Sequence, residues 1–323
     1  MSPCVLKGIA NVSSISGVTN LFYVFNSKFK RILTFHNVLP DGLFEQNVAN
    51  GVSCSASTFR KTIKMLSERW NFSTDLCDPR TITITFDDGY LNQYEIAAEI
   101  LKEEGDIPAY IFPAGDVLDG KMLVVDQLLH WASYVPSEIL REKGYANGTE
   151  LWVKEIWPRF NEDAQRLGMG VWQELNSVYP FEKIFIGLSS EYNRLRLSGI
   201  SQQQLKELRE RGWKVGWHTQ SHYPLSRLSI VEKRREMTPP VDMQGEVFSF
   251  PYGETASVDL EAVQLAEELG FPAAVSNTTV RSPLTGRYFL PRMSASSDKY
   301  LHDFELSGLK HFLKFRRLLP TFE

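Results

Sequence analysis

This chain has few cysteines, no excess of positive charge and no long apolar runs. Its three cysteines, Cys4, Cys54 and Cys77, include no Cys-x-x-Cys pair, which argues against a disulfide framework and a structural zinc knuckle. The net charge of −4 provides no basic surface for nucleic acid, so no nucleic-acid partner is expected. The apolar segment 18–25 is too short to span a bilayer, so no transmembrane segment is expected.

The first residues also lack a basic stretch followed by an unbroken apolar one, so no signal peptide is expected. With few cysteines, this favours a cytoplasmic location, with peripheral association at the membrane as the further option. The chain's 323 residues are 43% hydrophobic and 23% charged, which is ordinary for a globular enzyme.

Strand and helix patterns alternate from about residue 30 onward. Short apolar runs predict strands at 31–35, 81–86, 109–112, 215–217, 247–250, 273–276 and 288–290. Helical spacing predicts helices at 57–69, 91–104, 201–211 and 257–269. This alternation indicates an α/β architecture with a largely parallel sheet. About seven strands with polar groups at their carboxyl ends favour a barrel over an open sheet.

A less regular helical segment at about 126–192 interrupts the alternation. It contains four of the seven tryptophans, Trp131, Trp152, Trp157 and Trp172. We expect an insertion that serves either as a lid or substrate wall or as additional core. The expected organisation is an N-terminal extension at 1–29, a barrel at 30–300 carrying the insertion, and a helical tail at 301–323.

The strand at 81–86 runs into two adjacent carboxylates, Asp87 and Asp88. Two neighbouring acids at the end of a buried strand are unfavourable unless a cation lies nearby. Another apolar run leads into two histidines four positions apart, His218 and His222. One carboxylate and two neutral imidazoles form a ligand set suited to zinc-like ions, so Asp88, His218 and His222 are the predicted metal ligands.

Asp87 is then left for a different task, that of general base toward a water that the metal activates. Its alternative role is to cap the turn before Gly89. Arg292 could orient Asp87 through a bidentate contact, or it could be a surface arginine.

Expulsion of an amine from an amide requires a general acid, and His36 is the candidate because it follows a strand, as the other candidates do. Three other histidines, His130, His302 and His311, lie in expected helices, where a packing or surface role is favoured.

Three segments resemble the motifs of the polysaccharide deacetylase family, the NodB-homology domain of carbohydrate esterases similar to family 4. These are Thr-Phe-Asp-Asp-Gly at 85–89, His-Thr-Gln-Ser-His at 218–222 and Phe-Pro-Tyr-Gly at 250–253. The resemblance covers about residues 30–295 and implies a distorted (β/α)7 barrel. It also implies Asp87 as base, Asp88, His218 and His222 as ligands of a zinc-like ion, and the backbone N–H of Tyr252 as oxyanion donor.

The chain departs from the family's pattern at two places. Ser249 stands where many members have an arginine, and we expect Arg292 to replace that arginine in space. The late Leu-x-His motif that supplies the acid is absent, but Thr34-Phe-His36 is similar to the early Tyr/Phe-His segment of some members. That similarity again favours His36 as the acid.

The sequence therefore predicts a metal-dependent hydrolase of linear amides that removes an N-acetyl or other N-acyl group from an amino sugar. The substrate would be a cell-surface polysaccharide or its lipid-linked or nucleotide-linked precursor, and the cofactor a divalent ion, Zn2+ before Co2+ or Ni2+. A non-catalytic carbohydrate-binding barrel and a sugar deformylase are the alternatives.

Overall fold

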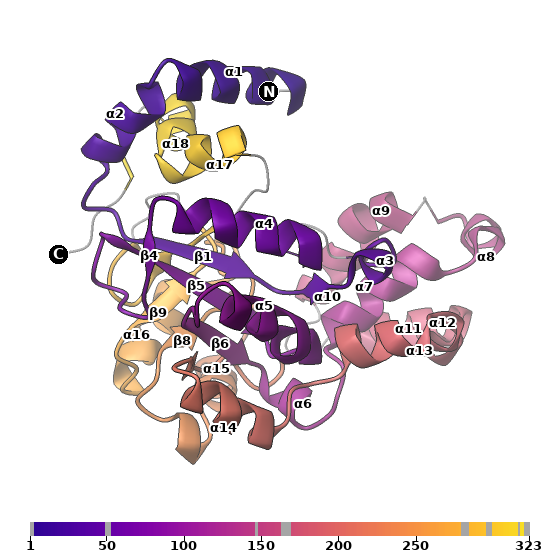
Figure 1. The fold of residues 1–323 in the computed structure, drawn as a ribbon. Helices are drawn as coiled ribbons and strands as arrows, with labels where there is room; N and C mark the ends of the chain where they lie inside the picture. The colour runs from indigo at the N-terminus through magenta and orange to yellow at the C-terminus, as the bar shows by residue number, and fades with distance from the viewer. Residues whose placement is uncertain are drawn as a thin grey trace.

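Parallel strands form two sheets at the centre of the protein (Figure 1). The computed structural model describes residues 3–48, 53–145, 148–162, 169–278, 284–294, 299–315 and 317–319. The larger sheet has the order β11–β1–β5–β6–β7, with β4 beside β5, and the smaller one the order β10–β9–β8. The strands of the larger sheet are β1 (Arg31–Phe35), β4 (Asn71–Phe72), β5 (Thr81–Asp88), β6 (Ala109–Pro113), β7 (Lys214–Val215) and β11 (Met293–Ser294). Those of the smaller sheet are β8 (Phe248–Ser249), β9 (Ala274–Ser276) and β10 (Leu290–Pro291).

The described strands do not close into the barrel that the sequence led us to expect. Between β7 and β8 the only ladder contact is the single bridge from Trp217 to Phe248. One chain segment leaves the smaller sheet as β10 and, after Arg292, joins the larger sheet as β11. The four strands at these junctions, β7, β8, β10 and β11, are each two residues long, too short to sustain a continuous ladder. The alternation of helices with parallel strands is confirmed, whereas the closed (β/α)7 barrel is not.

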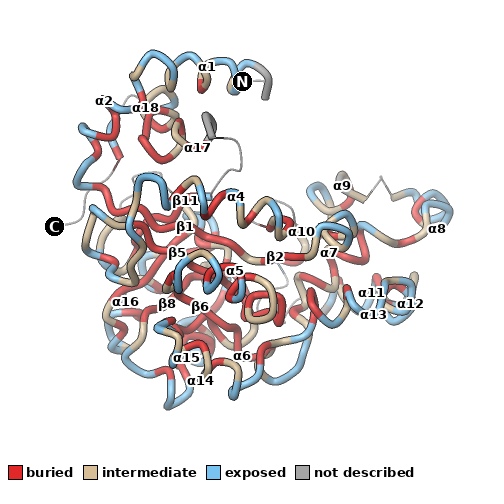
Figure 2. The backbone as a smooth tube through the Cα atoms, in the orientation of Figure 1, coloured by how far each residue is buried: buried red, intermediate tan, exposed pale blue. Residues whose placement is uncertain are grey.

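Amphipathic helices cover the sheets, and side-chain caps define where several of them begin. They are α4 (Ala56–Ser67), η1 (Gln93–Ala97), α5 (Ala98–Glu103), α14 (Gln202–Glu210), α15 (Ile230–Met237) and α16 (Leu260–Glu268). Ser55 caps α4, Asp259 caps α16, and Ser201 and Ser229 form capping boxes at α14 and α15. Figure 2 shows the strands buried beneath these helices.

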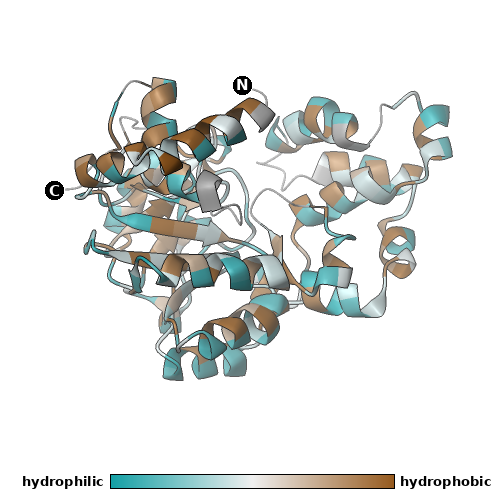
Figure 3. Ribbon diagram, turned by 45° about the horizontal axis from the view of Figure 1, so that its top comes forward, coloured by the Kyte–Doolittle hydropathy of each residue, from teal (hydrophilic) through white to brown (hydrophobic). Residues whose placement is uncertain are grey.

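A group of helices extends beyond one end of the sheets, at the right of Figures 1 and 3. They are α7 (Val124–Tyr134), α8 (Ser137–Glu142), α9 (Gly148–Leu151), η2 (Trp152–Ile156), α10 (Trp157–Glu162), α11 (Met169–Val178), α12 (Phe181–Gly187), α13 (Ser190–Tyr192) and η4 (Asn193–Leu197), and the short α6 (Gly115–Leu118) precedes them in the chain. The predicted insertion is therefore helical where it is described; its residues 146–147 and 163–168 lie outside the described ranges. The pair β2 (Val38–Leu39) and β3 (Cys54–Ser55), with α3 (Asp41–Phe44), lies near these helices.

The two ends of the chain pack against each other. Helices α1 (Pro3–Ile15) and α2 (Val18–Phe25) meet α17 (Lys299–Leu306) and α18 (Leu309–Phe315) around Ala10, Phe22, Phe304 and Leu309. The side chain of Asn26 donates to the carbonyl of Ser307 at 2.8 Å. The expected extension and tail thus form one layer. Within the described ranges, no helix has the length and hydrophobicity needed to cross a bilayer.

Candidate metal centre and active site

All the candidate residues lie at or just beyond the carboxyl ends of parallel strands. Asp87 and Asp88 end β5, and His36 follows β1 directly. His218 and His222 follow β7, and Tyr252 follows β8. Arg292 lies between β10 and β11. Because parallel strands place their carboxyl ends at one edge, side chains far apart in sequence meet there.

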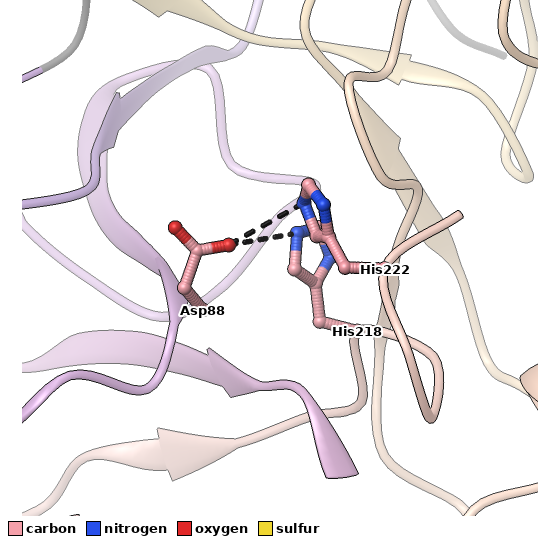
Figure 4. Close-up of side chains that lie close together, drawn as sticks. All are labelled: Asp88, His218 and His222. Atoms are coloured by element: carbon pink, nitrogen blue, oxygen red, sulfur yellow. Dashed lines mark ion pairs between the residues drawn. The ribbon is translucent and has the colours of Figure 1, made fainter. Parts of the chain in front are cut away.

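Asp88, His218 and His222 converge on one point (Figure 4). One ligand atom from each lies within 4.8 Å of the others, and all three residues are buried. The Nε2 atoms of His218 and His222 lie 3.6 and 3.4 Å from Oδ1 of Asp88. These three atoms have no hydrogen-bond partner among the described residues. Buried polar atoms normally have partners, so this group has the geometry and chemistry to hold a metal ion.

The protonation states around this point also suit a cation. Nδ1 of His218 lies 2.7 Å from the carbonyl oxygen of Ser249, which leaves Nε2 as the free acceptor when Nδ1 carries the proton. Burial lowers the pKa of His218 to about 4 and that of His222 to about 3, so both rings are neutral at physiological pH. Burial and the nearby carboxylates of Asp126 and Asp87 raise the pKa of Asp88, a shift that a bound cation would oppose.

Backbone strain is concentrated at this centre. Of the five non-glycine residues with positive φ in the described chain, four are site residues: Asp88 (77°), Thr219 (67°), His222 (60°) and Tyr252 (60°). Such conformations persist where the surrounding structure enforces them, and they gather at functional sites. Gly89 has φ of +86°, and a Cβ there would lie 2.5 Å from Cβ of Pro113. Only glycine therefore fits the turn after the two carboxylates.

Asp87 is fully buried and held by a guanidinium group. Arg292 donates from Nη1 to Oδ1 at 2.8 Å and from Nη2 to Oδ2 at 2.5 Å. Ser249 Oγ donates to Oδ1 of Asp87 at 3.0 Å and accepts from Nη2 of Arg292 at 3.0 Å. Although burial raises the pKa of Asp87, the charge and hydrogen bonds of Arg292 lower it well below its usual range. Ser249 stands where many members of the resembled family have an arginine, and we expected Arg292 to replace that arginine in space. Arg292 contacts both Asp87 and Ser249.

His36 borders the same site from the neighbouring strand. Its Nε2 lies 3.9 Å from Oδ2 of Asp87, and its side chain is 19% exposed. Burial lowers the pKa of His36 to about 4, so the ring is neutral at physiological pH. Gln93 donates through Nε2 to the carbonyls of both His36 (2.6 Å) and Asp87 (2.5 Å), which fixes the two strand ends relative to each other.

Tyr252 closes the site beside His222. Its hydroxyl donates to the carbonyl of His222 at 3.1 Å, and its ring lies edge-on to the His222 ring with centroids 4.7 Å apart. The ring of Trp157 contacts Tyr252 from the other side at 4.9 Å. The side chain of Tyr252 thus contacts both the loop that carries the metal-ligand candidate His222 and Trp157 of the insertion.

A cleft of about 320 Å³ opens over these residues. Its walls are His36, Asn37, Asp88, Leu123, Val125, Asp126, Leu129, Trp152, Val153, Trp157, Arg196, His222 and Tyr252. Two of the four insertion tryptophans, Trp152 and Trp157, line the cleft, whereas Trp131 is fully buried and Trp172 stacks on Phe181. Part of the insertion therefore lines the cleft, and part of it packs in the core.

Sequence reasoning missed a buried ion pair in this wall. Arg196 on η4 donates to Asp126 on α7 at 2.6 Å, and its Nε donates to Asn47 at 3.1 Å. Both charged residues line the cleft beside Asp88. No motif marks them, because they lie 70 positions apart and become partners only through the fold of the insertion.

The chain matches no family model and no curated protein. It is similar in structure to the Streptococcus pyogenes deacetylase PplD in complex with acetate, with a TM-score of 0.52 and 14% identity over 86% of this chain and 97% of that one. It is also similar to IcaB from Ammonifex degensii, with a TM-score of 0.50 and 17% identity over 87% of this chain and 97% of that one. At these identities the likeness establishes the fold, and that fold is shared with a deacetylase, as the resemblance of the motifs implied.

Proposed function

We propose that this protein is a metal-dependent hydrolase that removes an N-acetyl group from an amino sugar of a polysaccharide or its precursor. The observation that carries the proposal is the convergence of three buried ligand atoms without hydrogen-bond partners, on Asp88, His218 and His222, next to Asp87 held by Arg292. The similarity in fold to a deacetylase described in complex with acetate supports acetate as the product.

Each residue has a distinct part in this reaction. A divalent ion, in our proposal Zn2+, would supply Lewis acidity that polarises the amide carbonyl and lowers the pKa of the attacking water. Asp87, kept ionised by Arg292, accepts the proton of that water. His36, neutral in the free protein, faces the same cleft and lies 3.9 Å from Asp87; it takes up the proton that Asp87 removed from the water and passes it to the departing amine. The backbone N–H of Tyr252, at the turn after β8, donates to the developing oxyanion.

The cleft suits a sugar ring. Trp152 and Trp157 provide aromatic surface for the apolar face of a pyranose. The Asp126–Arg196 pair provides a hydrogen-bond acceptor and a donor for the hydroxyl groups of the sugar. We assign the limits 30–300 to the catalytic unit, with the helices near 126–192 as the wall that contacts substrate.

Acetate release from N-acetylated amino-sugar oligomers, measured with and without a chelator, tests the proposal. We expect release that stops on chelation and returns with Zn2+, Co2+ or Ni2+. Asp87→Asn should retain the metal but lose about 10²–10⁴-fold in kcat. Metal binding without release from any acylated sugar would instead support a non-catalytic carbohydrate-binding protein, and formate release would indicate a deformylase.

Trp157 provides a matched test of the substrate wall. Trp157→Ala should raise KM with a smaller change in kcat, because the ring contacts bound sugar and not the reacting atoms. The control is Trp70→Ala, because Trp70 packs against Tyr23 and Arg31 in the layer of chain ends, outside the cleft. Equal KM values for the two variants would contradict the assignment of the wall.

A further inference from the structure

Helices α1 and α2 present an apolar surface that the described part of the chain does not cover. Six of its side chains are 51–77% exposed: Val5, Val12, Ile15, Leu21, Val24 and Phe25. We call these six the α1–α2 face. With Val18, they make up half of the large apolar side chains that are exposed in the described ranges. Figure 2 shows both helices exposed along the outer edge of the molecule.

The opposite sides of the same helices are also apolar. Ala10 and Phe22 are buried against α17 and α18, and the rings of Phe22 and Phe312 lie 5.1 Å apart. Both helices thus carry apolar side chains on the packed side and on the outer side, and the outer ones are more stable in contact with an apolar environment than with water. An exposed apolar patch of this extent marks a contact with another molecule or a membrane.

The acids of the layer that α1, α2, α17 and α18 form, Asp303 and Glu305 on α17, are paired with Arg69 and Lys310, which leaves the exposed charges near the face mostly positive. Residues 1–40 contain four Lys/Arg and no Asp/Glu, and residues 307–319 contain another four and again no acid, although the whole chain has a net charge of −4. Lys30 and Arg31 are buried, whereas Lys28 and Lys314 are exposed. Lys314 lies on α18, Lys28 lies three residues beyond the end of α2, and Lys7 on α1 is exposed as well. The face is therefore apolar with a cationic surround, in a protein that is otherwise acidic.

We propose that the α1–α2 face docks on an anionic bilayer surface. The apolar side chains enter the headgroup boundary, and Lys28 and Lys314 interact with anionic lipid headgroups. A second copy of the chain is the less suitable occupant, because a two-fold contact through this face would bring two sets of like charges together. The inference stands apart from the deacylation proposed above, since it uses no residue of the cleft.

Cosedimentation of the full chain with vesicles tests the proposal. Vesicles of equal parts phosphatidylglycerol and phosphatidylcholine should bind the protein, vesicles of phosphatidylcholine alone should bind it weakly, and salt should reduce binding. Lys28→Gln with Lys314→Gln should lower partition onto the anionic vesicles roughly 30-fold, at about fivefold per cation. Leu21→Ser with Val24→Ser should lower it at least about tenfold.

The matched control is Ile186→Ser with Val231→Ser. These side chains are 74% and 76% exposed but lie on α12 and α15, so their replacement should leave vesicle binding unchanged. Unfolding midpoints and acetate release from a soluble oligomer should be the same in all variants, which separates this proposal from the catalytic one. Absence of vesicle binding, equal loss in the control, or conversion of a dimer to a monomer by Leu21→Ser with Val24→Ser would overturn it.

Discussion

The contact between Arg292 and Asp87 allows a quantitative prediction about stability. Both side chains are fully buried, and Asp87 accepts two hydrogen bonds from the guanidinium and one from Ser249. Arg292→Met keeps most of the volume but removes the charge and both bonds. The carboxylate would then be buried with a single neutral donor. We expect a loss of about 3–5 kcal/mol in the free energy of unfolding, the usual effect of removing one partner of a buried pair.

The double variant shows whether the loss comes from the unpaired charge. Asp87→Asn alone leaves a buried guanidinium without its carboxylate and should also be destabilising. Arg292→Met with Asp87→Asn removes both charges, so its destabilisation should be smaller than the sum of the two single effects by about 2 kcal/mol or more. Urea unfolding of the four proteins, all with chelator present, measures this coupling free energy.

Two outcomes would refute this reasoning. If the single effects simply add in the double variant, the two side chains do not depend on each other. If Arg292→Met costs less than about 1 kcal/mol, Asp87 is not held as a buried carboxylate. Ser249→Ala is the internal comparison, because it removes one neutral hydrogen bond and should cost only about 1 kcal/mol.

Three further predictions concern the metal ligands, the turn after β5 and the insertion. His218→Ala should reduce metal content, measured by elemental analysis, from one ion per chain to near zero, together with activity. Gly89→Ala should destabilise by about 1–3 kcal/mol in urea unfolding, because the new Cβ has no space beside Pro113. Gly212→Ala is the control: its φ of +82° is close to that of Gly89 (+86°) and its Cβ would meet no atom within 4 Å, so it should show the backbone effect alone. Asp126→Asn should destabilise at neutral pH: burial raises the pKa of Asp126, but the charge and hydrogen bonds of Arg196 bring it below its ordinary value. That stabilisation is present above the unfolded pKa of about 3.9 and is lost as the pH falls through the lower folded pKa, so the difference from the natural protein should shrink below about pH 4.

Most secondary structure was predictable because its signals are local. The expected strand at 31–35 coincides with β1, and those at 81–86 and 109–112 correspond to β5 and β6. The later strands were predicted at the right places but are shorter, and the distorted barrel expected from them is not confirmed, because the described strands do not close. Hydrophobic runs indicate where a strand lies but not how many ladder bonds its ends retain, since that depends on neighbouring strands.

The sequence by itself determined which residue types stand at the strand ends: two adjacent carboxylates, two histidines four positions apart, and one histidine after the first strand. Their spacing is a property of the chain, and so is their chemistry. The sequence offered Arg292 as one candidate partner of Asp87, and the tertiary structure decided for that pairing. Tertiary structure alone paired Arg196 with Asp126 and the first two helices with the last two. It also separated Trp152 and Trp157 in the cleft from Trp131 in the core. The physical reason is that partners more than 60 residues apart meet only when the intervening elements pack, and packing depends on the shape of the whole core.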